Sequence, residues 1–79
     1  MSVKTNRQPT EEEFMKNTAL WPGSVCPIKR RVDGRLQCAY LVNARPVVYH
    51  GNMWEPKTSD PREEFESHAA IVAAGWVVD

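Results

Sequence analysis

Residues 24–54 read SVCPIKRRVDGRLQCAYLVNARPVVYHGNMW, and β-branched and aromatic residues recur here at about every second position, between turn-forming residues. A period of two sends alternate side chains to the two faces of a sheet. The segments Val32-Asp33-Gly34 and Asn43-Ala44-Arg45-Pro46 favour turns. The stretch therefore predicts an antiparallel meander of three strands, over residues 24–31, 35–42 and 47–54.

The turn of the first hairpin decides which side chains face the core. A two-residue Asp33-Gly34 turn would place Cys38 opposite Lys29, a charge against a candidate core residue. A three-residue loop over residues 32–34, with its glycine in the left-handed conformation, places Cys38 opposite Ile28 instead. Because a slip of one residue exchanges the two faces of a strand, hydrophobic consistency favours the three-residue loop.

This register, with Tyr40 paired to Tyr49 across the second hairpin, gives the sheet two different faces. We expect the core face to carry Cys26, Ile28, Leu36, Cys38, Tyr40, Val42, Val47, Tyr49 and Met53. The opposite face would carry Val25, Lys29, Arg31, Gln37, Ala39, Leu41, Val48, His50, Asn52 and Trp54.

The second face mixes cations with a tryptophan, which neither a solvated nor a buried face explains. Tryptophan and arginine often anchor protein interfaces. The face is therefore a candidate partner-binding surface, formed by Lys29, Arg31, Gln37, His50, Asn52 and Trp54. In the competing interpretation, a helix covers part of this face and the charges lie at its rim.

The N-terminal part predicts a short helix. Residues 1–9 are polar, show no pattern and are expected to be disordered. Thr10 and Glu13 have the spacing of a capping box, which predicts a helix over about residues 11–18. The segment Trp21-Pro22-Gly23 would end it, because proline restricts the residue before it and glycine permits a turn.

The C-terminal part predicts a second helix with two possible starts. Asp60-Pro61 has the form of a cap followed by proline at the first helical position. Ser67 is the alternative N-cap, which would leave residues 63–66 extended. Gly75 ends the helix in either case, and Trp76-Val77-Val78 predicts a short final strand.

Length and composition indicate one small domain. The chain has 79 residues, of which 42% are hydrophobic and 25% charged, as in ordinary globular proteins. We expect a single α+β domain over residues 10–79, with an antiparallel sheet of three or four strands, a short N-terminal helix and a C-terminal helix on the core face. No apolar run approaches the ~18 residues that span a bilayer, and residues 1–7 lack the apolar stretch of a signal peptide, so we expect a cytoplasmic protein.

Metal and disulfide chemistry are not expected. Cys26, Cys38 and His50 are separated by twelve residues each, and His68 follows. Structural zinc sites bring their ligands in close pairs, which the sequence lacks. In the expected register the two cysteines lie diagonally on one face, with Cβ atoms about 7 Å apart, whereas a disulfide needs about 4 Å.

Catalysis and cofactor binding are not expected either. The sequence contains no glycine-rich phosphate loop, nucleophile elbow or nucleotide fingerprint. We therefore expect a protein that works by binding, without cofactor or metal.

Charge separates two classes of partner. The net charge of the chain is zero, but residues 24–54 carry +4 and residues 55–79 carry −4. Cations beside aromatic residues on a sheet can hold phosphates and stack bases, which makes a nucleic-acid-binding module the alternative function. The zero net charge and the acidic C-terminal part disfavour a polyanion and favour a protein partner.

The C-terminal segment carries one resemblance. Residues 65–67, Phe-Glu-Ser, and residues 73–79, Ala-Ala-Gly-Trp-Val-Val-Asp, resemble the ending of many short proteins of bacteriophages and prophages. In those proteins a capping serine precedes a short helix, then Gly-Trp and a terminal strand. The resemblance implies a small phage accessory protein that binds and blocks a host enzyme or a defence complex, a class that includes anti-CRISPR proteins. It implies no catalytic residue.

Overall fold

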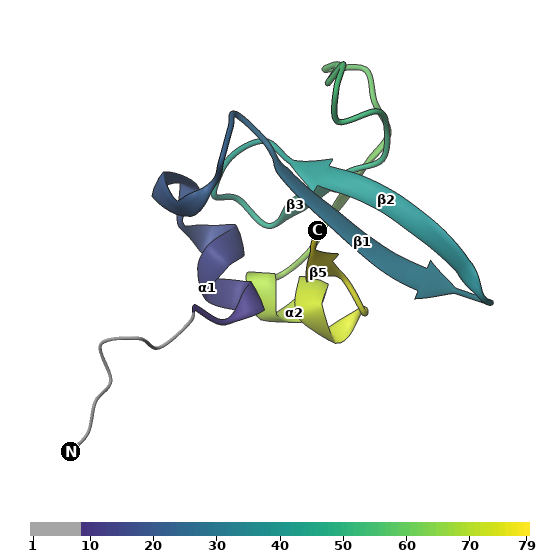
Figure 1. Cartoon of the computed structure of the whole chain (residues 1–79), viewed down its shortest axis with the longest axis horizontal. Helices are drawn as coiled ribbons and strands as arrows, with labels where there is room; N and C mark the ends of the chain where they lie inside the picture. The colour runs from purple at the N-terminus through teal and green to yellow at the C-terminus, as the bar shows by residue number, and fades with distance from the viewer. Residues whose placement is uncertain (1–8) are drawn as a thin grey trace.

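A computed structural model describes residues 9–79 and has the α+β architecture that the sequence predicts (Figure 1). Its antiparallel five-stranded sheet has the spatial order β4-β3-β2-β1-β5. The elements, in chain order, are α1 (Glu11–Lys16), the 3-10 helix η2 (Thr18–Leu20), β1 (Cys26–Val32), β2 (Arg35–Leu41), β3 (Val47–Tyr49), β4 (Arg62–Glu64), α2 (His68–Ala73) and β5 (Val77–Val78). The disorder predicted for residues 1–9 concerns a segment that, except for its last residue, lies outside the described residues.

The β1–β2 hairpin has a two-residue turn, so the predicted three-residue loop is wrong. Asp33 and Gly34 both have positive φ, 52° and 80°, as a type I′ turn requires. Lys29 therefore lies opposite Cys38. This pairing is tolerated because both side chains lie on the face of the sheet opposite to the helices, where Cys38 is exposed and Lys29 is half-buried.

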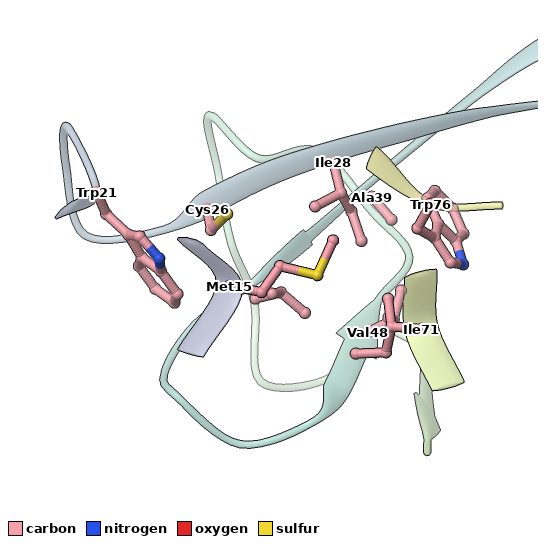
Figure 2. Packing of buried hydrophobic residues seen from close by; sticks show 9 residues of the cluster. Met15, Trp21, Cys26, Ile28, Ala39, Val48, Ile71 and Trp76 are labelled. Atoms are coloured by element: carbon pink, nitrogen blue, oxygen red, sulfur yellow. The ribbon is translucent and has the colours of Figure 1, made fainter. Parts of the chain in front are cut away.

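The two-residue turn changes which side chains form the core. Ala39, Leu41 and Val48 were expected on the second face, but all three are buried under the helices, while Leu36 and Cys38 are exposed. The core cluster unites both helices with one face of the sheet (Figure 2) and consists of Met15, Trp21, Cys26, Ile28, Ala39, Leu41, Val48, Ile71 and Trp76.

The opposite face of the sheet, called the outer face below, is buried in one place. The predicted pairing of Tyr40 with Tyr49 is confirmed, and their rings stack with centroids 5.6 Å apart. Both lie on the outer face, because Tyr40 alternates with the core residues Ala39 and Leu41. Residues 50–61 form a loop rather than the end of the third strand, and Tyr40 is fully buried next to it.

The helix starts follow from local side-chain caps. The Thr10–Glu13 capping box is present, with Glu13 N donating to Thr10 Oγ1 over 3.1 Å. The second helix begins after Ser67, whose Oγ accepts from Ala70 N, so the alternative start at Pro61 is wrong. Because α2 begins only after Ser67, residues 62–64 remain extended and pair with β3. They form β4, a strand that was not predicted from the sequence.

The final strand forms where the sequence predicts it. Val77 and Val78 pair with Lys29 and Ile28 of β1, and Asp79 N donates to Pro27 O over 2.9 Å. No helix within residues 9–79 is long and apolar enough to cross a membrane.

The register makes a prediction about two leucines of β2. Leu41 is fully buried and Leu36 is 55% exposed. We expect Leu41→Ala to lower the free energy of unfolding by about 2–5 kcal/mol, because it leaves a cavity in the core. The matched change Leu36→Ala should cost less than about 1 kcal/mol. Urea denaturation of both variants measures the difference, and a larger loss for Leu36→Ala would show that the faces are assigned wrongly.

Candidate partner-binding surface

The structure divides the six predicted site residues between the two sides of the sheet. Lys29 and Arg31 lie on the outer face, two residues apart on β1. Gln37 lies opposite Arg30 and faces the helix side. The ring of His50 is 5.8 Å from that of the core residue Trp76, which places it on the helix side as well. The other two site residues, Asn52 and Trp54, lie in the loop over residues 50–61.

Gln37 and His50 have structural partners on the helix side. Arg30 Nε donates to Gln37 Oε1 over 2.8 Å, and His50 Nε2 lies 3.6 Å from Glu63 Oε1. Arg30 also lies over the ring of Trp76, 4.4 Å from its centroid. We therefore remove Gln37 and His50 from the candidate surface.

Arg30 connects the hairpin to the end of α2, a role that the sequence analysis missed. One of its terminal nitrogens donates to Ala74 O over 3.1 Å, at the C-terminal cap of the helix, where a cation is favourable. Its guanidinium also makes a cation–π contact with Trp76. The sequence signal was the position of this cation two residues after Ile28, which places it on the core side of β1.

The outer face near β5 combines cations with exposed apolar groups. Arg31 lies opposite Leu36, and Lys29 lies between Cys38 of β2 and Val77 of β5, which is 38% exposed. A hollow of about 340 Å³ at this place is lined by Lys29, Arg30, Arg31, Leu36, Gly75, Val77 and Asp79.

The two outer-face cations of β1 differ in their partners. Lys29 Nζ lies 3.2 Å from Asp79 Oδ1, an exposed ion pair. Arg31 has no ion pair with a carboxylate of residues 9–79; one of its terminal nitrogens is 3.5 Å from Gly34 O. Beside β5, Arg31 is thus the outer-face cation that is available to an acidic group.

A second hollow lies beside Trp54. Its volume is about 430 Å³, and its lining is mostly apolar: Pro22, Gly23, Ser24, Val25, Pro27, Met53, Trp54 and Pro56. Trp54 is 83% exposed. Pro27 belongs to this hollow and has the same facing as Lys29 and Arg31, so the three follow one another on the outer face over about 13 Å. We call Pro27, Lys29, Arg31, Leu36 and Trp54 the outer surface.

The loop that carries Trp54 is attached to the sheet through Tyr40 and Asp60. The Tyr40 hydroxyl donates to Asp60 Oδ2, which also accepts from Lys57 N over 3.2 Å. A Cβ at position 51 would lie 2.6 Å from Asp60 Cγ, so Gly51 allows the carboxylate to approach. Burial, followed by the hydrogen bond to Asp60, raises the pKa of Tyr40 above its ordinary value. Asp60 was expected only as a helix cap, and its contact with Tyr40 was not predicted from the sequence.

Asn52 shapes the loop from within. Its Oδ1 accepts from Trp54 N over 2.9 Å, and Asn52 O accepts from Glu55 N over 3.0 Å. A side-chain amide oxygen that binds the main chain two residues on forms a turn and orients the residues it spans. Asn52 therefore positions Trp54.

The cysteines lie on opposite faces of the sheet, not diagonally on one face as expected. Cys26 is buried in the core, and Cys38 is exposed on the outer face. Burial, followed by the charge of Glu11, raises the pKa of Cys26 to about 12, so its thiol stays protonated and unreactive near neutral pH. Within residues 9–79, no three His, Cys, Asp or Glu side chains are grouped to hold a metal ion.

Comparison of the chain with protein-family models, with curated proteins and with solved structures finds no match.

The attachment of the loop is testable with two tyrosines. Tyr40→Phe removes the hydroxyl that binds Asp60 and Lys57, and we expect it to lower the free energy of unfolding by about 1–3 kcal/mol. Tyr49→Phe is the matched control, because no hydrogen bond links its hydroxyl to another residue of 9–79, and it should cost less than about 0.5 kcal/mol. Amide exchange of Lys57 should accelerate in Tyr40→Phe only. Equal effects in both variants would contradict the attachment.

Proposed function

We propose that this chain is a small non-enzymatic binding protein that occupies an acidic site on a protein partner through its outer surface. The observation that carries the proposal is the position of Trp54, largely exposed beside an apolar hollow and on the same side of the sheet as Lys29 and Arg31. Tryptophan and arginine are enriched among the residues that dominate binding energy.

The energetics of the outer surface favour an anchor with charged neighbours. A buried tryptophan removes about 150–250 Å² from water, which corresponds to about 4–6 kcal/mol before the costs of association are subtracted. Because Asn52 and the Tyr40–Asp60 contact already order the loop, less conformational entropy is lost on binding. The cations chiefly accelerate association with an acidic partner.

The charge distribution favours protein over nucleic acid as the partner. Residues 29–35 carry a net charge of +3, from Lys29, Arg30, Arg31 and Arg35 against Asp33. However, Arg30 is engaged with Trp76 and Lys29 with Asp79, so few cations remain for a row of phosphates. A protein site needs only one or two complementary charges around an apolar anchor.

The resemblance of the C-terminal segment to phage proteins extends the proposal to a partner class. The partner is then a host protein or a defence complex, and the mode of action is inhibition by occupying its surface. The outer surface supports this mode, because it combines an exposed tryptophan with cations that can contact a partner.

The proposal is tested by a binding titration against the partner captured from host lysate after nuclease treatment. We expect Trp54→Ala to accelerate dissociation by roughly 30-fold or more, as the loss of an anchor does. Lys29→Glu combined with Arg31→Glu should slow association about tenfold. Arg35→Glu is the matched control, because Arg35 is also exposed on the hairpin but has the opposite facing.

The outcomes of this titration separate the alternatives. With circular dichroism showing intact folds, wild-type binding by both test variants would refute the proposal. A steep loss of affinity with added salt, together with disappearance of binding after nuclease treatment, would identify the nucleic-acid alternative instead. An Arg35→Glu effect equal to that of the double variant would show that net charge, not the outer surface, controls binding.

A further inference from the structure

The sheet edge on the β5 side has one covered part and one open part. At β5 the main chain is covered, because Val78 N donates to Glu11 Oε1 over 2.6 Å. Beyond β5 the edge is formed by β1 itself, since β5 pairs only with residues 28 and 29 of a strand that continues to Val32. Proteins commonly cover or shorten open edges, because unpaired main-chain groups can bind another strand.

The main chain of Arg31 points to the open part of this edge. Pro27 O accepts from Asp79 N, on the β5 side of β1. Because main-chain groups alternate in direction along a strand, those of Lys29 and Arg31 have the same direction. Lys29 pairs with Val77, but Arg31 has no main-chain hydrogen bond to any residue of 9–79 on this side.

The space beside Arg31 is open. Arg31 and Gly75, at which the chain leaves the line of β5, both line the hollow of about 340 Å³. Gly75 has φ 99° and donates its N–H back to Val72 O, so it turns away from β1 instead of extending β5. The ladder therefore ends one step before Arg31.

We propose that an extended acidic segment of the partner adds to the sheet at this edge as an antiparallel strand, paired with the main chain of Arg31. The inference rests on the proposed function and specifies how the partner is held. The donor and acceptor of Arg31 supply the pairing, and the residue opposite Arg31 places an acidic side chain beside its guanidinium on the outer face. In an antiparallel strand the residue before it lies beside Val32, which is 42% exposed, so an apolar residue fits there.

Charge argues against a second copy of this chain as the occupant. An antiparallel pairing of two such edges centred on Arg31 would place Arg31 opposite Arg31 of the other copy. Like charges directly opposite each other destabilise a sheet. An acidic strand has the complementary charge at the same position.

The test uses the capped peptide acetyl-TEVEVET-amide and the whole chain labelled with ¹⁵N. We expect saturable binding in which the Arg31 amide becomes protected from hydrogen exchange by about tenfold or more. The Arg30 amide, which points toward β2, serves as the internal control and should not change. Arg45→Ala, at an exposed cation in the turn between β2 and β3, is the control variant and should bind the peptide as the wild type does.

N-methylated peptides separate main-chain pairing from simple charge attraction. Methylation of the glutamate amides blocks the groups that face Arg31 and should abolish binding, whereas methylation of the valine amides should not. A peptide with lysine in place of each glutamate should bind at least about tenfold more weakly than acetyl-TEVEVET-amide. Equal binding of all these peptides, or an Arg31 amide that stays unprotected, would overturn the inference.

Two further outcomes are decisive. If the Arg31 amide becomes protected as protein concentration rises without peptide, and sedimentation shows a dimer, then a second copy occupies the edge and the inference is wrong. If the peptide does not bind, but Trp54→Ala still weakens binding of the captured partner, edge pairing is overturned and the proposed function stands.

Discussion

Asp33 and Gly34 both adopt the left-handed backbone conformation, and this turn determines the rest of the sheet. A type I′ turn matches the right-handed twist of two paired strands, which is why Asp-Gly is favoured there. With two residues in the turn, Cys26 and Ile28 share a face with Ala39 and Leu41. That face is the one on which both helices pack (Figure 2), so the core exists only in this register.

The same turn determines which side chains lie on the outer face. Near β3, Tyr40 is buried beside the loop over residues 50–61, and its bond to Asp60 fixes the base of the loop that carries Trp54. Farther along β1, Lys29 and Arg31 are left on the outer face with the exposed Leu36. The helices thus cover one side of the sheet, and the β1–β2 hairpin projects beyond them (Figure 1).

Features with a local cause could be predicted from the sequence. The capping box of Thr10 and Glu13 needs only a spacing of three residues, and the Tyr40–Tyr49 pairing needs only the turn between two apolar runs. The start of α2 at Ser67 appeared as one of two alternatives. Local signals alone do not separate the two helix starts, because residues 62–64 become a strand only by pairing with β3, which lies earlier in the chain.

The register and the full composition of the candidate site could not be predicted in the same way. Matching Cys38 to Ile28 assumed that every apolar residue of the hairpin belongs to the core, but Leu36 and Cys38 are exposed on the face opposite to the helices. The error moved Gln37 and His50 onto the proposed surface. The role of Arg30 was missed for a different reason, because its partners are Trp76 and Ala74 at the end of α2, the latter 44 residues away in the sequence.

The cross-strand contacts of the hairpin in solution test this account most directly. In the two-residue register, Lys29–Cys38 and Arg31–Leu36 are pairs without mutual hydrogen bonds, whose Cα atoms approach to about 4.5 Å and whose Hα atoms face each other. We expect strong nuclear Overhauser effects between the Hα atoms of both pairs. A strong Hα contact between Ile28 and Cys38 would instead place the hairpin in the three-residue register, and the core and outer surface described above would both be wrong.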